Sequence, residues 1–217
     1  LAARGLKERL RVLVAQLMGV NVEEVDYRDG RVVHLRSGKS MSIQEIANAV
    51  TSNVGGTWGY RAEPKLEETA YFGLKDYTYP YGSHVALVEV TEEGLVKVLD
   101  YVAIDDIGFV VNPMLAEGQV IGGVIQGFGE VMLEEVKYDE SGNLLTQSFG
   151  EYWLPSTMES FKVKWIYLED GKSDAPIPSK GIAEGPLIGV LPALTRAIER
   201  AVNKRITKIP VDVKLLI

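Results

Sequence analysis

The sequence contains no cysteine and only two histidines, His34 and His84, in 217 residues. Without cysteine the chain by itself forms no disulfide, holds no thiolate zinc site and ligates no iron–sulfur cluster. Two imidazoles are also too few for a multi-histidine metal site. We therefore expect no metal-ligating residues in this chain, and a metal that it uses must arrive on a carrier molecule.

Long apolar runs and basic clusters are missing as well. No apolar run approaches the roughly 18–20 residues that span a bilayer, and the amphipathic, basic start of the chain is unlike a signal peptide. The net charge is −7, from 23 basic and 30 acidic residues, without a basic stripe. Nucleic-acid binding rests on clustered Lys and Arg, so we expect neither a nucleic-acid nor a membrane partner.

The first 60 residues predict a helix–hairpin–helix subdomain. The stretch "ARGLKERLRVLVAQLMG" has leucines at helical spacing and a stop at Gly19. Next, "VDYRDGRVVHL" reads as a hairpin that turns at Asp29–Gly30. Ser42 and Glu45 form a capping box at the start of a short second helix.

Residues 61–217 predict a second subdomain with more elements. They are two strands within 84–104, a glycine-rich helix in 112–136, a hairpin in 135–149, a strand in 161–169 and a helix in 187–202. No partner for the strand in 161–169 is evident from the sequence. Hairpins mixed with separate helices predict an α+β fold, with two subdomains of antiparallel hairpins or sheets packed against helices.

The glycine-rich helix is energetically unusual. Each helical glycine costs about 0.8–1 kcal/mol relative to alanine, and this segment has five: Gly118, Gly122, Gly123, Gly127 and Gly129. Either another backbone packs closely, for which Gly118, Gly122 and Gly129 share roughly one face, or a cofactor lies against the helix start, where amides bind anions. Gln119 and Gln126 could then hydrogen-bond a flat heterocycle. Spacing alone favours packing.

Adjacent acids and the two histidines carry weaker signals. Asp105 and Asp106 follow one another at a strand end and so point to opposite faces. This arrangement disfavours a paired-carboxylate site and favours loop capping. His34 and His84 lie in or beside strands and are interpreted as structural or surface residues.

Glu184 is a lone carboxylate in the uncharged turn "PSKGIAEGP", residues 178–186. Its side chain either caps the following helix or lies in solvent. Alternatively, the small neighbours Ala183 and Gly185 leave room for a substrate or a metal-bound ligand, and Glu184 acts as a general base. The local pattern alone favours the cap.

Five ordered stretches carry a family resemblance. The chain resembles the C-terminal, molybdopterin-binding part of the large subunits of the xanthine dehydrogenase / aldehyde oxidase / carbon monoxide dehydrogenase family. The stretches are "YPYGSHVALVEV", "VAIDDIGFVVNP", "EGQVIGGVIQGFGEVMLEE", "YDESGNLLTQSFGEYWLP" and "SKGIAEGP". The upstream helix, hairpin and second helix fit the same family, so the resemblance implies a fold of the molybdopterin-binding domain type over nearly the whole chain.

The resemblance also implies a site. The cofactor would contact residues of two segments, namely Gln119, Gly122 and Gly123, and the turn of Lys180, Gly181, Ile182 and Ala183. Glu184 would be the catalytic base, taking the proton from a molybdenum-bound hydroxide whose oxygen attacks an electrophilic carbon. The family's turn usually has glycine where this chain has Ala183, and alanine is tolerated there only if its φ is negative.

The resemblance implies that the chain is inactive alone, as the C-terminal segment of a molybdenum hydroxylase, either a naturally split subunit or a truncated piece. The molybdenum–molybdopterin, in its simple form or as the cytosine dinucleotide, would be shared with a partner chain, and iron–sulfur and flavin groups would lie elsewhere. Expected partners are the N-terminal half of the molybdenum subunit, the iron–sulfur and FAD subunits, and further copies of the chain through uncovered apolar surface, all in the cytoplasm.

The substrate class stays open between aldehydes, N-heterocycles and carbon monoxide. The alternative to an enzyme segment is a non-catalytic assembly or interaction module that descends from the same family and binds no molybdenum.

Overall fold

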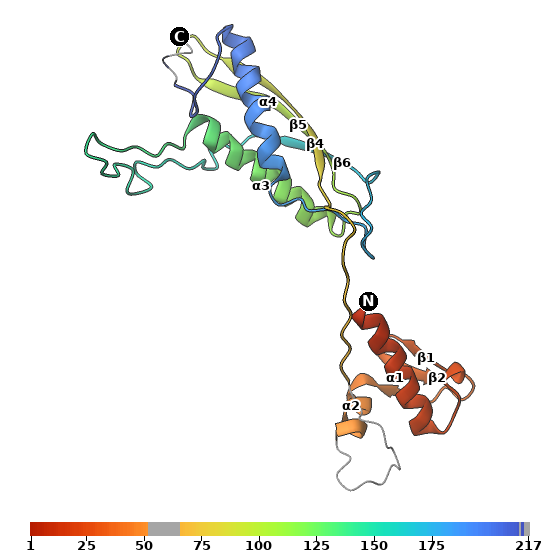
Figure 1. Cartoon of the computed structure of the whole chain (residues 1–217). Helices are drawn as coiled ribbons and strands as arrows, with labels where there is room; N and C mark the ends of the chain where they lie inside the picture. The colour runs from red at the N-terminus through yellow and green to blue at the C-terminus, as the bar shows by residue number, and fades with distance from the viewer. Residues whose placement is uncertain (52–65, 213, 215–217) are drawn as a thin grey trace. The chain divides into compact units, whose positions relative to one another are not determined.

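The computed structural model describes residues 1–51, 66–212 and 214, and the chain divides into two compact units, Leu1–Gly73 and Leu74–Ile217. Figure 1 shows the elements of each unit. The predicted subdomain boundary between residues 60 and 61 lies outside the described residues and stays a prediction. The α+β class is confirmed, because each unit combines helices with a three-stranded sheet.

Unit 1 packs two helices against a small antiparallel sheet of order β1-β2-β3. Its elements are α1 (Ala2–Met18), the 3₁₀ turn η1 (Val22–Glu24), β1 (Val25–Arg28), β2 (Arg31–His34), β3 (Ser40–Ser42) and α2 (Ile43–Thr51). One apolar cluster joins them, comprising Leu10, Val14, Ala15, Val25, Val32 and Ile46.

The local signals of unit 1 are confirmed. Helix α1 ends at Gly19, whose φ of 67° is left-handed. The hairpin turns through Asp29 and Gly30, at φ values of 47° and 77°. The Ser42 amide donates to Glu45 Oε2 at 2.7 Å, while the Glu45 amide donates to Ser42 Oγ at 3.2 Å. The 3₁₀ turn η1 and the strand β3 were not predicted, since three residues of mixed polarity give no helix or strand pattern.

Unit 2 has a mixed sheet of order β4-β5-β6. Its strands are β4 (Tyr81–Val90), β5 (Val96–Asp106) and β6 (Val163–Leu168). β4 and β5 form the predicted antiparallel hairpin, whereas β6 runs parallel to β5. The chain between them includes a long helix, the kind of crossover that parallel pairing needs. This crossover supplies the partner that the sequence did not reveal, and it makes the sheet mixed rather than purely antiparallel.

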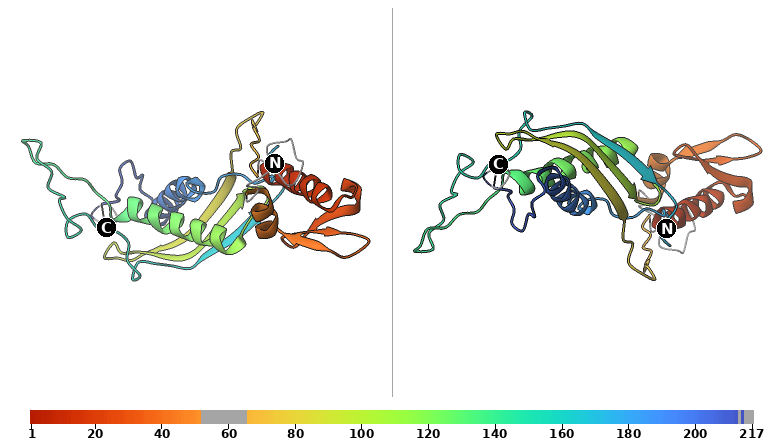
Figure 2. Two further views of the ribbon diagram at one scale, coloured as in Figure 1. Left: turned by 90° about the horizontal axis from the view of Figure 1, so that it is seen from below. Right: turned by 90° about the horizontal axis from the view of Figure 1, so that it is seen from above.

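Two helices cover one face of that sheet, α3 (Pro113–Met132) and α4 (Gly185–Val202). Figure 2 shows them side by side along the sheet. Asn112 is the N-cap of α3, and its Oδ1 accepts from the Leu115 amide at 3.1 Å. The core between helices and sheet comprises Tyr101, Ala103, Val120, Val124, Phe128, Val131, Val163, Val190, Leu194, Ile198 and Val211.

The five glycines of α3 divide into packed and open positions. A Cβ on Gly123 would lie 3.1 Å from Pro186 Cβ, and one on Gly127 would overlap the Val190 side chain, so α4 fits closely only against glycine. Gly129 is likewise closed off by neighbouring side chains. A Cβ on Gly118 or Gly122 would meet no described atom within 4 Å. Packing is therefore confirmed, but of the predicted packing positions Gly118, Gly122 and Gly129 only Gly129 is packed, and the prediction is wrong for the other two.

The hairpin predicted for residues 135–149 forms only next to its turn, where the Asp139 amide donates to Asn143 O at 3.0 Å and the Leu145 amide donates to Lys137 O at 2.8 Å. In this fully described stretch only one antiparallel bridge forms, between Tyr138 and Leu144. The predicted turn is real, with Gly142 at φ 81° and Asp139 accepting from the Asn143 amide at 2.8 Å. The segment extends from unit 2 as an arm (Figure 1) and contains no strand.

The loop after β5 holds the turn that precedes α4. The Phe109 amide donates to Pro178 O at 2.9 Å, and the Lys180 amide donates to Ile107 O at 2.8 Å. Gly108, between these two, has a φ of 61°, and a Cβ there would overlap Pro178 O. Main-chain pairing at a position that requires glycine thus fixes the start of the turn.

Asp106 secures the same loop from its other side. Its carboxylate accepts from the Gly108 amide at 3.0 Å and the Gly171 amide at 2.8 Å, and it lies 3.3 Å from Lys180 Nζ. Burial alone would raise the pKa of Asp106, but these two hydrogen bonds and the Lys180 ammonium outweigh it and lower the pKa. The predicted loop-capping role is confirmed for Asp106.

Replacing Gly127 by Ala should lower the free energy of unfolding by about 1–3 kcal/mol, because the added methyl collides with Val190. The matched variant Gly118→Ala adds the same methyl to the same helix in open space, so it should raise stability by up to about 1 kcal/mol. Urea unfolding of both variants measures the difference. Equal effects of the two substitutions would show that α3 and α4 do not pack through Gly127.

The lowered pKa of Asp106 predicts a pH-dependent contribution to stability. A carboxyl whose pKa is lower folded than unfolded stabilises above its unfolded pKa, and that contribution disappears as the pH falls through the folded value. Asp106→Asn should therefore lower the free energy of unfolding most near neutral pH, and progressively less as the pH falls below 3.8, the ordinary pKa of an aspartate. Unfolding measured at several pH values tests this. The control is Asp170→Asn, because Asp170 is exposed in the loop after β6. A pH-independent cost would contradict the assignment.

Candidate functional site

Glu184 occupies the N-cap position of α4, with a φ of −111°. No hydrogen bond from its side chain caps the helix, so the capping interpretation is wrong. The residue is exposed, and within the described part of the chain its carboxylate has no hydrogen-bond or ion-pair partner. Both oxygens are thus free to accept a proton or a ligand.

The side chains of the turn alternate between inside and outside. Ile182 packs into a small apolar cluster with Ile107, Val110 and Ala116. Its neighbours Gly181 and Ala183 consequently face outward and are exposed. Among described residues other than glycine, positive φ values occur only at Asp29 and Asn203, so Ala183 meets its steric requirement.

Gln119 links the glycine-rich helix to this turn. Its side-chain amide donates to the carbonyl of Ala183 at 2.9 Å. Gln119 and Ala183, predicted from separate motifs, are therefore in direct contact. Gly122 is exposed, unlike Gly127, which packs against Val190 five residues further along α3. Gly123 is buried against Pro186 instead, so the structure gives it a packing role and leaves its contact with a cofactor a prediction.

A cavity of about 520 Å³ opens beside Glu184, between the start of β4 and the first turn of α4. Its lining comes from two segments and one strand end: Tyr79, Pro80, Tyr81, Gly82, His84, Asp105, Gly181, Ile182, Ala183, Glu184, Gly185, Ile188 and Gly189. The predicted residues Gly181, Ile182, Ala183 and Glu184 all belong to it. Gln119 and Gly122 do not line it, and Gln119 is joined to the lining through its hydrogen bond to Ala183.

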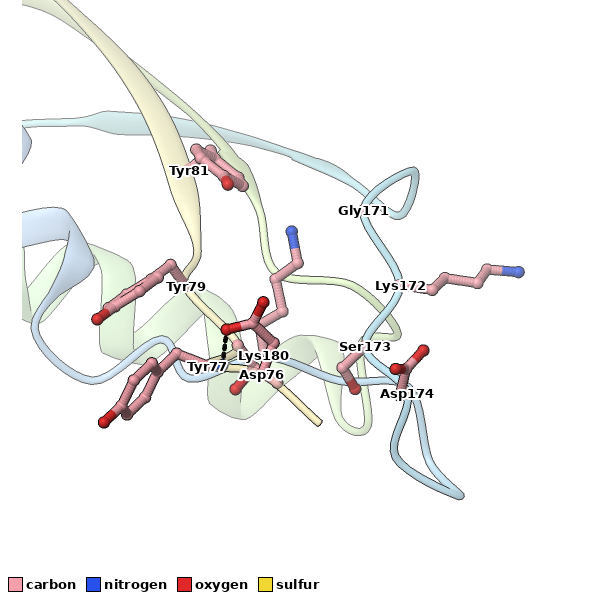
Figure 3. A pocket seen from close by; sticks show the side chains of 10 residues that line it. Asp76, Tyr77, Tyr79, Tyr81, Gly171, Lys172, Ser173, Asp174 and Lys180 are labelled. Atoms are coloured by element: carbon pink, nitrogen blue, oxygen red, sulfur yellow. Dashed lines mark hydrogen bonds between the residues drawn. The ribbon is translucent and has the colours of Figure 1, made fainter. Parts of the chain in front are cut away.

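Lys180 is held away from this cavity. Its side chain is 6% exposed, and Nζ lies 3.3 Å from Asp106 Oδ1 and 4.8 Å from the centre of the Tyr81 ring. It lines a separate hollow of about 320 Å³ with Gly171 and residues 76–79 (Figure 3). Since its amide already bonds to Ile107 O, only the Lys180 carbonyl is left for the predicted backbone contact with a cofactor.

The sequence missed a buried polar network in the cavity wall. His84 Nδ1 lies 2.8 Å from the Tyr101 hydroxyl, and His84 Nε2 lies 3.4 Å from Asp105 Oδ1. Trp165 Nε1 donates to Asp105 Oδ2 at 3.1 Å. The loop-capping prediction for Asp105 is therefore wrong. Its carboxylate points into the protein, whereas that of Asp106 accepts hydrogen bonds from loop amides.

A signal for this network did exist in the hairpin pattern. His84 pairs with Ala103, and Gly82 pairs with Asp105, so His84, Tyr101 and Asp105 share the inner face. Register could not be counted from the turn, because a bulge between Leu87 and Val88 shifts it. Burial, and to a lesser extent the charge of Asp105, raise the pKa of Tyr101, which therefore remains a neutral phenol.

The described residues offer neither a cluster of metal ligands nor a helical membrane span. They contain no group of three or more His, Cys, Asp or Glu side chains that could hold a metal ion. None of the described helices is long and apolar enough to cross a membrane. The chemistry of the site therefore has to be sought in what the cavity and the exposed face of α3 could bind.

Comparison with protein families gives one match, the molybdopterin cofactor-binding domain, over residues 1–161. This range includes the glycine-rich helix and ends before the turn of Glu184. It covers most of the chain, across both structural units.

Individual relatives extend the similarity beyond that range. The large chain of carbon monoxide dehydrogenase from Afipia carboxidovorans is 31% identical over 206 residues, which are 92% of this chain and 24% of the relative. The nicotine 6-hydroxylase large subunit of Paenarthrobacter nicotinovorans is 30% identical over 93% of this chain and 25% of its own. The crystal structure of quinoline 2-oxidoreductase from Pseudomonas putida matches with a TM-score of 0.77 and 28% identity, over 98% of this chain and 28% of that one.

The chain thus spans about a quarter of the length of these relatives. All three are similar to it over both units, in sequence or in structure. The chain belongs to the molybdopterin cofactor-binding domain family found in the large subunits of molybdenum hydroxylases.

Proposed function

We propose that this chain forms one wall of the molybdopterin pocket of a cytoplasmic molybdenum hydroxylase and provides its general base, Glu184. The observation that carries the proposal is a carboxylate without a partner among the described residues, at the rim of a cavity of about 520 Å³. Its neighbour Ala183 is bonded to Gln119 of the glycine-rich helix. Family membership supports a molybdopterin as the group that this carboxylate serves.

The exposed face of α3 fits a large flat cofactor. Gly118 and Gly122 lie one helical turn apart, and a Cβ on either would meet no described atom within 4 Å. Both glycines lie inside the helix on its exposed side. Each costs about 0.8–1 kcal/mol relative to alanine, and no packing contact in this chain compensates for that cost. A ring system that lies directly against the backbone would explain both. Gln119 and the outward-facing Gly181 and Ala183 would hold its edge.

When bound, the cofactor supplies the redox chemistry of hydroxylation. The chain's own contribution is proton transfer and placement. A general base must be an ionised acceptor within reach of the proton that it removes, and Glu184 presents two free oxygens. Its neighbours Ala183 and Gly185 have minimal side chains, so a reactant can approach the carboxylate closely.

We propose that the rest of the enzyme is supplied by protein outside these 217 residues. The rest of the pocket comes from the N-terminal part of the molybdenum subunit, with the cofactor as a simple pterin or a cytosine dinucleotide, and electrons leave through iron–sulfur and FAD subunits. The names of the similar proteins refer to carbon monoxide, nicotine and quinoline. We therefore propose hydroxylation as the reaction class, with an aldehyde, an N-heterocycle or a carbon monoxide-like molecule as substrate.

Glu184→Gln in the complete molybdenum enzyme should lower kcat by about 10²–10⁴-fold, the usual contribution of a general base. Molybdenum content, measured by mass spectrometry, should stay unchanged, because the amide is nearly the same size. The matched variant Glu92→Gln, exposed in the turn between β4 and β5, should keep full activity. Activity of Glu184→Gln within a few-fold of the unmodified enzyme would instead favour a non-catalytic assembly module.

Gly122→Leu tests whether the cofactor lies against α3. The new side chain points into open space in this chain, and leucine favours helices, so the chain itself should not lose stability. The complete enzyme should retain several-fold less molybdenum, since the side chain occupies the place of the pterin. Glu117→Leu, also exposed and roughly 140° around the same helix, is the control. Unchanged molybdenum content in Gly122→Leu would place the cofactor elsewhere.

A further inference from the structure

The buried network of His84, Tyr101, Asp105 and Trp165 has no role in the proposed proton transfer, yet it lies in the wall of the same cavity. The side chains of His84 and Asp105 are only 1% and 4% exposed. Burying polar groups costs stability unless each finds a hydrogen bond. Here every member has one, which makes the network a specific feature of the fold.

Two glycines make room for this network. A Cβ on Gly189 would lie 2.7 Å from His84 Nδ1, and a Cβ on Gly82 would overlap Asp105 Oδ1. Gly189 is in the second turn of α4, and Gly82 is in β4. The absence of a side chain at Gly189 makes room for the imidazole of His84, and its absence at Gly82 makes room for the carboxylate of Asp105.

The hydrogen bonds define where the protons lie. The two ring nitrogens face different partners, and we assign the Tyr101 hydroxyl as the donor to His84 Nδ1. The other ring nitrogen, Nε2, then carries the imidazole proton and donates it to Asp105 Oδ1. Asp105 receives a second proton donor in the Trp165 indole, at its other oxygen. The reversed tautomer would turn an Nε2 lone pair toward the carboxylate, which is unfavourable.

The fixed ring lies under the helix that Glu184 begins. His84 contacts α4 at Gly189, five residues after Glu184, and both residues line one cavity. On the other side, Gln119 holds Ala183, the residue before Glu184. The start of α4 is therefore held from the sheet by the imidazole and from α3 by the glutamine amide.

We propose that His84 is a positioning residue for Glu184. Locked as the Nε2–H tautomer between Tyr101 and Asp105, the imidazole fixes the first turns of α4 against β4, and this in turn fixes where the Glu184 carboxylate points. The inference rests on the proposed role of Glu184 as the base, but its structural part can be tested independently of activity.

The first experiment observes the imidazole nitrogens by NMR in the 217-residue chain labelled with ¹⁵N-histidine. Only His34 and His84 contribute, and His34 serves as an internal reference. We expect His84 as a single Nε2–H tautomer whose proton exchanges slowly with water. Tyr101→Phe should change the His84 signals and leave those of His34 in place. A His84 ring in the Nδ1–H form, or one averaged between tautomers, would overturn the proposal.

The second experiment measures kinetics in the complete molybdenum enzyme. Tyr101→Phe removes one hydrogen bond, and Gly189→Ala pushes the ring with a methyl group; His84→Gln removes the ring. Each should lower kcat by about 10- to 100-fold through misplacement of the base, with KM and molybdenum content unchanged. His34→Gln, in unit 1, should match the unmodified enzyme.

These outcomes separate the two proposals. If Glu184→Gln is inactive while Tyr101→Phe and Gly189→Ala keep kcat within twofold, His84 does not position the base, and the role of Glu184 stands. If Glu184→Gln remains active, the proposed function fails, and with it the positioning role of His84. Should His84→Gln not fold, the other two variants and the spectrum of the unmodified chain still decide the matter.

Discussion

The site depends on the close contact between α3 and α4, which glycine makes possible. At every fourth residue α3 meets the segment that leads into and forms α4, through three contacts: Gln119 with Ala183, Gly123 with Pro186, and Gly127 with Val190. Because two of the three positions on α3 lack a side chain, α4 lies directly on the helix backbone. The turn that carries Glu184 is consequently fixed to α3 at one end, while hydrogen bonds to the loop after β5 fix its other end.

Much of the fold could be predicted because its signals are local. Gly19 ends α1, Asp29–Gly30 turns the first hairpin, and Ser42 with Glu45 begins α2, each through contacts within a few residues. The errors concern pairings between distant segments. The parallel partner of β6 lies beyond a whole helix, and the arm at 135–149 forms its turn and one bridge but no strands. No local pattern contains that information.

The same limit applies to the site. Sequence located Glu184 and Gln119 but could not show that Gln119 bonds to Ala183, since 64 residues separate them. Glycine spacing indicated a close approach without telling which face of α3 packs, so Gly118 and Gly122 were first grouped with the packed positions. Asp105 looked like a loop residue because the bulge in the hairpin hides its register relative to His84. The role of Glu184 as a base came from the family resemblance, whereas its local pattern indicated a cap.

We propose that the glycines of α3 have two roles: Gly123 and Gly127 let α4 pack closely, and Gly118 and Gly122 leave room for a pterin beside Glu184. A crystal structure of the complete enzyme with its cofactor tests this most directly. We expect the pterin against Gly118 and Gly122, with the Glu184 carboxylate facing the molybdenum. A structure in which another protein segment covers these two glycines and the molybdenum lies away from Glu184 would contradict it.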